Sequence, residues 1–455
     1  MINDTLYYII SGVIILLVLL GIFLMSKVKT ARLGNALSAL AILAATITIL
    51  LKYEIVSIWQ LHIYFQIGIV VGLLVAFKVK MIQMPQMIAL LNGLGGLASL
   101  IVGGFALYQI GADQSLFSNY ASMLAIIVGS ITFIGSIIAS LKLHRVISQK
   151  PIKMKFHGLV ITLIALMILT LLIMSGLVKI DSLYYLLGAI VLSSLFGFMF
   201  SISIGGADMP ITISLLNSLS GMAASISGLA IGDPLLVSIG AVVGASGLIL
   251  TKIMSNAMNK SILEIILGKT TLNAPLKEAP ATSTYVQTKD PYEIFNQAKD
   301  VIIVPGYGMA VAQAQFLVKE LSDLIKSKGG QVRFAIHPVA GRMPGHMNVL
   351  LAEVDIDYDD LYDMEMINDA FKTSDLVFVI GANDVINPKA KTDESTPLYG
   401  MPILHVDEAK DIFIFNYDTN PGYSGVDNPL YQGDVHLFLG DAKETLKDFL
   451  EHAKA

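Results

Sequence analysis

The segment from Val301 to Gln315, V-I-I-V-P-G-Y-G-M-A-V-A-Q-A-Q, carries the clearest chemical signal in the sequence. It begins with four β-branched residues, Val301–Val304, which are typical of a buried strand. A tight turn that contains Gly306 follows, and then a stretch of helix-forming residues. This order opens a dinucleotide-binding βαβ unit, in which N–H groups at the start of the helix face a pyrophosphate. Val311 occupies the third glycine position of G-x-G-x-x-G, so the motif alone is a weak signal. The predicted nucleotide contacts are Gly306, Tyr307, Gly308, Met309, Ala310 and Val311.

The rest of the C-terminal third alternates strands with helices, which predicts a doubly wound parallel sheet. The helix after the first turn is expected to reach about Lys328. The further strands are expected at Gln331–Ile336, Leu376–Ile380, Ile403–Val406, Ile412–Phe415 and Val435–Leu439. Ligands of such sheets bind at the carboxyl ends of the strands. Polar loops follow there, at His337–Asn348, Gly381–Pro388 and Asn416–Pro429.

The part of the chain before about residue 260 has the composition of a membrane domain. The chain has 455 residues, of which 55% are hydrophobic and only 14% charged, and its mean hydropathy is +0.70. A soluble protein would be nearer one quarter charged. The absence of cysteine excludes disulfides and thiolate metal sites, and no metal site is predicted. A net charge of −5 gives no basic field for nucleic acid.

Nine apolar runs are long enough to cross a bilayer. They are Leu6–Met25, Gly34–Leu51, Ser57–Phe77, Met84–Ile110, Asn119–Leu141, Phe156–Val178, Leu183–Ile204, Met209–Ile231 and Leu235–Met258. Basic residues cluster after alternate spans, which predicts an external N-terminus and a cytoplasmic C-terminal domain. The sequence therefore predicts a multi-pass protein of the cell (inner or plasma) membrane.

A segment rich in proline, threonine and alanine separates the two halves and is predicted to be a flexible linker. The predicted organisation is a transmembrane helical domain at 1–265, the linker at 266–291 and a Rossmann-like domain at 292–455. The expected fold class is thus a polytopic α-helical membrane domain of about nine helices, followed by an α/β doubly wound parallel-sheet domain.

The membrane half contains an internal repeat. Met84–Ala98 matches Met209–Ala223 at a constant offset of 125 residues. Asn92 and Asn217 occupy equivalent places, roughly 10 Å into the membrane at 1.5 Å per residue. A lone membrane asparagine is as readily explained by helix–helix hydrogen bonding as by function, but two at equal depth favour a polar path for protons or ions. Asp208 precedes the second copy, either as an inner-surface carboxylate of this path or as a helix cap.

Several long motifs, taken together, resemble one family. They are G-Y-G-M-A-V-A-Q-A-Q, I-H-P-V-A-G-R-M-P-G-H-M-N-V-L-L-A-E, G-A-N-D-V-I-N-P, G-Y-S-G-V-D-N-P-L-Y and, in the membrane half, G-G-A-D-M-P. They closely resemble the β subunit of proton-translocating NAD(P) transhydrogenase. The resemblance implies an enzyme that transfers hydride from NADH to NADP⁺, with NADP(H) on this chain, coupled to proton translocation. It also implies a partner α subunit that carries NAD(H), and two αβ units in one bilayer-embedded assembly.

The resemblance implies roles for individual residues. Arg342 would bond a phosphate. Asp384 would lie near the nicotinamide carboxamide and couple its redox state to the membrane, as the catalytic residue. Tyr423 would help to cover the nucleotide. The implied binding set is completed by Gly381, Ala382, Asn383, Asn416, Tyr417, Asp418 and Gly422.

The sequence departs from the family pattern in two places. Family members usually have Lys-Arg-Ser, which holds the NADP 2′-phosphate, where this chain has Asn416-Tyr417-Asp418. A carboxylate there would repel a 2′-phosphate and could bond a ribose 2′-hydroxyl, unless Lys389 or Lys391 compensates. Some members also carry a membrane histidine at the place of Asn92, so the titrating group is expected elsewhere.

Two other function classes fit parts of the sequence. A nucleotide-gated membrane transporter or channel would need a substrate site in the bundle, and the spans contain no obvious charge cluster. A membrane-anchored NAD(P)-dependent enzyme would need its own substrate base, for which His337 and His346 are the candidates nearby. One nucleotide motif in a chain of nine spans fits half of a transhydrogenase better.

Overall fold

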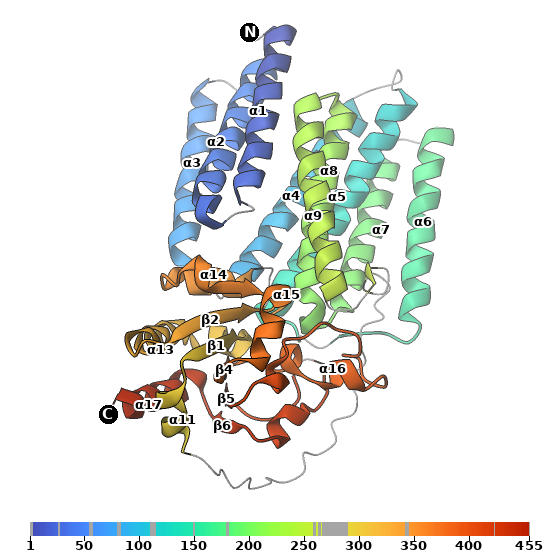
Figure 1. The fold of residues 1–455 in the computed structure, drawn as a ribbon. Coiled ribbons are helices and arrows are strands. Elements are labelled where there is room, and N and C mark those ends of the chain that lie inside the picture. The colour runs from blue at the N-terminus through green and yellow to red at the C-terminus, as the bar shows by residue number, and fades with distance from the viewer. Residues whose placement is uncertain are drawn as a thin grey trace. The chain divides into compact units, whose positions relative to one another are not determined.

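The computed structural model describes residues 3–25, 28–53, 58–79, 83–109, 115–148, 151–178, 182–257, 261–262, 265, 290–341, 345–422 and 424–454. The predicted linker lies almost entirely outside these ranges. The chain forms two compact units, one of 1–204 with 212–251 and one of 205–211 with 252–455. Figure 1 shows the long helices of the first and the sheet of the second.

The first unit is built from long apolar helices. They are α1 (Asp4–Met25), α2 (Val28–Tyr53), α3 (Ile58–Lys78), α4 (Met84–Gln109), α5 (Leu116–Leu143), α6 (His157–Leu177), α7 (Ser182–Ile202), α8 (Met209–Ile231) and α9 (Pro234–Ala257). Within the described residues, eight of them are long and apolar enough to cross a membrane, and α3 contributes a shorter apolar stretch, His62–Lys78. The predicted polytopic helical domain is confirmed. The predicted span ends Ser57, Ile110 and Met258 fall outside the described residues.

Glycines bring the repeated helices into close contact. An added Cβ at Gly96 in α4 would lie 2.8 Å from the Gly129 oxygen of α5, and one at Gly228 in α8 would lie 2.6 Å from the Val237 nitrogen of α9. Each copy of the repeat therefore starts a tightly packed helical hairpin. The copies also meet each other, because Ser227 in α8 donates to the Ser99 carbonyl of α4 (3.2 Å).

The second unit contains one parallel sheet, with strand order β3-β2-β1-β4-β5-β6. The strands are β1 (Asp300–Pro305), β2 (Gln331–Ile336), β3 (Leu361–Asp363), β4 (Leu376–Ile380), β5 (Ile412–Asn416) and β6 (His436–Leu439). They run from yellow to red in Figure 1. The connection order reverses between β1 and β4, which is where open α/β sheets bind ligands. The predicted doubly wound sheet is confirmed.

Short helices complete this unit: α11 (Pro291–Gln297), α12 (Tyr307–Ala312), α13 (Gln315–Ser327), α14 (His346–Glu353), α15 (Met364–Ile367), α16 (Lys389–Thr392) and α17 (Ala442–Lys454). On one side of the sheet, Phe378, Phe413 and Phe415 pack around Phe449 of α17, with ring centroids 5.7 to 5.9 Å from it. These rings bury enough apolar area to hold the sheet rigid beneath its loops.

Two local predictions were wrong, and one short strand was not predicted. Ile403–Val406 is buried but forms no strand; Leu404 instead donates to the Val385 carbonyl (2.9 Å), and a 3₁₀ turn follows. A short apolar run fits any buried segment, so its pattern could not distinguish the two. The three-residue β3 was not predicted, since it lies in an acidic stretch. The predicted helix to Lys328 is divided at Gln313, whose φ is 54°.

Candidate functional site

Two glycine loops meet at the point where the sheet order reverses. Gly306 donates its N–H to the Ile380 carbonyl, and Gly308 donates to the Gly381 carbonyl, both at 2.8 Å. A Cβ at either position would come within 3.0 Å of the backbone of Gly381. Gly306 itself has an extended backbone (φ −123°), which any residue can adopt. Glycine is therefore required here by the contact between loops, not by the turn.

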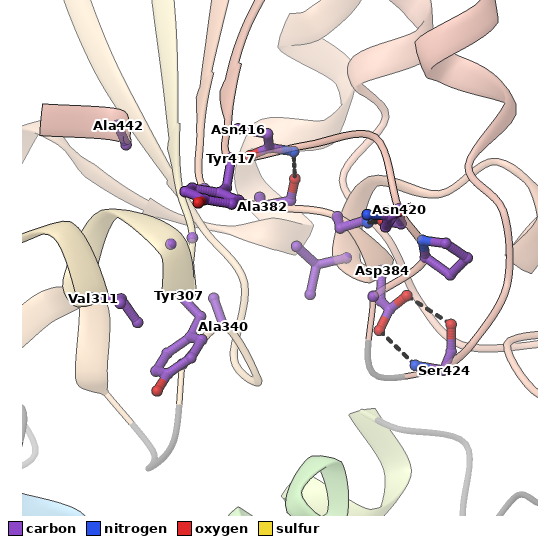
Figure 2. Close-up of a pocket in the computed structure, with 18 of the residues that line it drawn as sticks. Tyr307, Val311, Ala340, Ala382, Asp384, Asn416, Tyr417, Asn420, Ser424 and Ala442 are labelled. Carbon is purple, nitrogen blue, oxygen red and sulfur yellow. Dashed lines mark hydrogen bonds between the residues drawn. The ribbon is translucent and has the colours of Figure 1, made fainter. Parts of the chain in front are cut away.

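A cavity of about 590 Å³ opens over these loops (Figure 2). This volume is within the range of small-molecule sites. The walls come from loops that follow β1, β2, β4, β5 and β6. The predicted site residues that line it are Gly306, Tyr307, Gly308, Val311, Gly381, Ala382, Asn383, Asp384, Asn416, Tyr417, Asp418 and Gly422. The structure thus brings together loops that are more than 100 residues apart in sequence.

Two predicted residues are placed differently, and two are not described. Met309 and Ala310 are buried beneath the first turn of α12 and do not line the cavity. Arg342 and Tyr423 lie outside the described residues. The predicted phosphate contact of Arg342 and the covering role of Tyr423 therefore stay predictions.

The carboxylate of Asp384 ties one loop to another. Its Oδ1 accepts a hydrogen bond from the Ser424 hydroxyl (2.7 Å), and its Oδ2 accepts one from the Ser424 N–H (3.0 Å), as Figure 2 shows. A Cβ at Gly422 would lie 2.7 Å from Asp384 Oδ1. Bonds to a charged acceptor are the stronger kind. Asp384 therefore fixes the loop after β5 at the rim of the cavity.

Asparagine amides reinforce the same junction. Asn416 is buried and donates to the Ala382 carbonyl (2.9 Å) and to the Tyr431 hydroxyl (2.7 Å). Asn383 donates to the Asn420 carbonyl (2.9 Å). Burial raises the pKa of Tyr431 above its ordinary value, so this phenol stays protonated and neutral. Sequence reasoning missed Ser424 and Tyr431, because nothing local signals a bond between loops about 40 residues apart.

His337, at the end of β2, is not available as a base. Nε2 lies 2.9 Å from the Pro402 carbonyl, and Nδ1 accepts from the Val339 N–H (3.3 Å). Both nitrogens are therefore engaged, in the neutral Nε2–H tautomer. Burial lowers the pKa of His337 from 6.5 to about 4. The interpretation of His337 as a substrate base loses its support.

This pKa predicts a pH-dependent stability. The unfolded chain binds a proton at His337 near pH 6.5 and the folded chain only near pH 4, so the stabilisation is present above pH 6.5 and is lost as pH falls toward 4. At about 1.4 kcal/mol per pH unit the contribution is about 3 kcal/mol. We expect His337→Gln to flatten this part of the pH profile in urea unfolding of residues 290–455. His452→Gln, on the exposed face of α17, is the matched control; equal slopes in both variants would contradict the assignment.

The three residues predicted for the proton path are all held in the fold, two of them in the helical unit. Asn92 is buried, and its amide donates weakly to the Ile213 carbonyl of α8 (3.4 Å). Asn217 is half-buried. Asp208, in the second compact unit, is only 2% exposed. The hydrogen bond of Asn92 agrees with a role in holding two helices together. The part of Asn92 in a proton path stays a prediction.

Two further polar groups lie buried in the helical unit and were not predicted from the sequence as functional residues. Lys142 in α5 is fully buried and donates to the Ile202 and Ile204 carbonyls (2.6 and 2.8 Å), thereby capping the end of α7. The buried Asp233 accepts from the Tyr7 hydroxyl (2.7 Å) and from the first turn of α9. Their sequence positions, at the ends of spans, resemble those of ordinary loop charges.

Comparisons with known proteins show the family of the chain. A family model described as NAD(P) transhydrogenase beta subunit matches residues 5–452. The NAD(P) transhydrogenase subunit beta of Rhodospirillum rubrum is 40% identical over 457 aligned residues, which cover 98% of this chain and 97% of that protein. The subunit of the same name from a named strain of that species gives the same values. The chain belongs to the NAD(P) transhydrogenase beta subunit family, a family of oxidoreductases.

Proposed function

We propose that hydride passes directly between NADH, held by a partner α subunit, and a second dinucleotide held in the cavity of this chain. We further propose that the transfer is coupled to proton translocation across the membrane. In the family's reaction the second dinucleotide is NADP⁺, which is also the cofactor predicted from this sequence. The observation that carries the proposal is the cavity at the point of strand-order reversal, walled by the backbones of Gly306 and Gly308.

The residues of the cavity suit a binding and orienting role. When bound, the nicotinamide supplies the hydride chemistry, so the protein needs no side chain as acid or base. Among the described lining residues there is no histidine, lysine or cysteine. The N–H groups at the start of α12 are suited to a pyrophosphate, although this helix is short. Asp384, through Ser424, holds the rim loop that would exclude water from the transferring carbon atoms.

The remaining parts of the proposal concern the assembly. We propose 1–265 as the proton-translocating domain, 266–291 as a tether and 292–455 as the nucleotide domain. A nicotinamide donor on another polypeptide is needed because the described residues form one dinucleotide-type site. The proposed assembly is a homodimer of αβ units in the cell (inner or plasma) membrane, with the nucleotide domains cytoplasmic. Asn92, Asn217 and Asp208 are proposed members of the proton path.

Isotope transfer tests the reaction. The chain would be combined with its α subunit and supplied with NADH deuterated at C4, with the acetylpyridine analogues of NAD⁺ and NADP⁺ as alternative acceptors. Direct transfer predicts deuterium at C4 of a reduced analogue, with no exchange with solvent protons. Loss of the label to water, or no reduction of either analogue, would contradict the proposal.

A further inference from the structure

The cavity carries only negative charge among its described lining residues. Asp384, Asp418 and Asp441 line it, and none of the other residues that the structure describes in its walls is a lysine, arginine or histidine. NADP(H) differs from NAD(H) by a 2′-phosphate on the adenosine ribose, and a phosphate monoester carries about −1.5 to −2 charges at pH 7. Proteins usually hold such a group with arginine or lysine. The described walls therefore offer no cation to a 2′-phosphate.

Two of these carboxylates share one edge. Asp418 follows β5 by two residues, and Asp441 follows β6 by two residues. The strands are parallel neighbours, with Asn416 paired to Leu439, so both acids lie beyond the same end of the sheet. Tyr417, which is 78% exposed, also lines the cavity (Figure 2). A ribose on this side would meet acceptors, not cations.

Asp418 is held ready to accept a hydrogen bond. Its Oδ1 accepts from the Asn420 N–H (3.0 Å), which fixes the carboxylate in the turn. Within the part of the chain that the structure describes, its Oδ2 has no hydrogen-bond partner. Asp384, by contrast, already uses both oxygens on Ser424. An aspartate after a parallel strand is the group by which NAD sites bond a ribose 2′-hydroxyl.

The lysines that could have compensated are elsewhere. Lys391 pairs with Asp407 (3.3 Å) and Glu408 (3.8 Å). Neither Lys389 nor Lys391 lines the cavity. The loop after β2 reaches the cavity through Val339, Ala340 and Gly341, none of which carries a charge.

We propose that Asp418 is a specificity-determining residue, which bonds the adenosine 2′-hydroxyl of NAD(H) and repels the 2′-phosphate of NADP(H). This inference rests on the proposed nucleotide site and names its substrate class. The inference concerns which dinucleotide binds: with NAD(H) in both sites, hydride passage between the two C4 atoms is an exchange without net chemical change, and a net reaction needs NADP⁺ or an acceptor analogue on this chain.

Binding measurements on the full-length chain in detergent test this inference. In isothermal titration calorimetry we expect NADH to bind at least about tenfold more tightly than NADPH, the size of one charge-assisted bond. Higher salt should strengthen NADPH binding, because salt screens a repulsion. Asp418→Asn keeps the acceptor for Asn420 but removes the charge, so it should improve NADPH binding. Asp418→Ser with Tyr417→Arg should reverse the preference, whereas Asp434→Ser, an exposed acid outside the cavity lining, should change neither affinity.

The results that would contradict the role of Asp418 differ from those that would contradict the nucleotide site itself. Tighter NADPH binding by the unaltered chain, weakened by salt, would overturn the role of Asp418 and leave the nucleotide site standing. An unchanged NADPH affinity in Asp418→Asn, in a protein that still binds NADH, would also overturn it. Binding of neither nucleotide would overturn the proposed function together with this inference.

Discussion

Alanine in place of Gly306 is expected to abolish nucleotide binding and to destabilise the C-terminal unit by about 3 kcal/mol, the upper end for overpacking. The reason is backbone contact, since the new Cβ would come within 3.0 Å of the Gly381 oxygen and the Ala382 nitrogen. Neither loop can move away without breaking the hydrogen bond from the Gly306 N–H to the Ile380 carbonyl. The loops would separate, and the floor of the cavity would be lost.

Urea unfolding and calorimetric titration of residues 290–455 would measure both effects. Gly433→Ala is the matched control, because its Cβ would meet only the Leu430 oxygen at 3.4 Å, an ordinary contact. We expect the control to keep the stability and the nucleotide affinity of the parent. A Gly306→Ala protein that still binds nucleotide at parental affinity would show that the two glycine loops do not form the floor of the site.

The second large effect is expected at Asp384. Asp384→Ala removes both acceptors of Ser424, each of which is a bond to a charged group worth about 1.5–3 kcal/mol. Part of that energy holds the rim loop over the nucleotide, so nucleotide affinity should fall by about ten- to hundredfold. Hydride transfer should fall at least as far, because the loop orients the reacting ring.

Ser424→Ala provides the graded comparison. It removes the hydroxyl bond and keeps the bond from the Ser424 N–H to Asp384, so its loss of affinity should be smaller. Affinity and transfer rate would be measured for both variants and the parent. An equal loss in both variants, or none in Asp384→Ala, would contradict the assignment of Asp384 to the rim loop.

The sequence was sufficient to predict those helices and strands that consist of an uninterrupted run of hydrophobic residues. The long spans are far more apolar than anything a soluble core requires, and β1, β4 and β5 are buried along their length. The same property made Ile403–Val406 a false strand, because burial alone does not specify strand pairing. The site loops were predicted from their position after strands. Most of the predicted residues line the cavity, whereas Met309 and Ala310 are buried, and Arg342 and Tyr423 lie outside the described residues.

What sequence could not provide are contacts between distant segments. The requirement for Gly306 comes from Gly381, and the partner of Asp384 is Ser424, 40 residues on. Likewise, Lys142 looks like a loop cation but caps α7 from a fully buried position. Such pairings depend on which strands and which helices become neighbours, and this is decided only on folding.

The central claim, that hydride transfer moves protons, is tested most directly in proteoliposomes. The chain would be reconstituted with its α subunit, supplied with NADH and an acetylpyridine acceptor, and followed simultaneously by nucleotide absorbance and an entrapped pH-sensitive dye. The account predicts that turnover generates a pH gradient and that a protonophore collapses the gradient while accelerating turnover. Turnover without any gradient, at a rate indifferent to the protonophore, would contradict it.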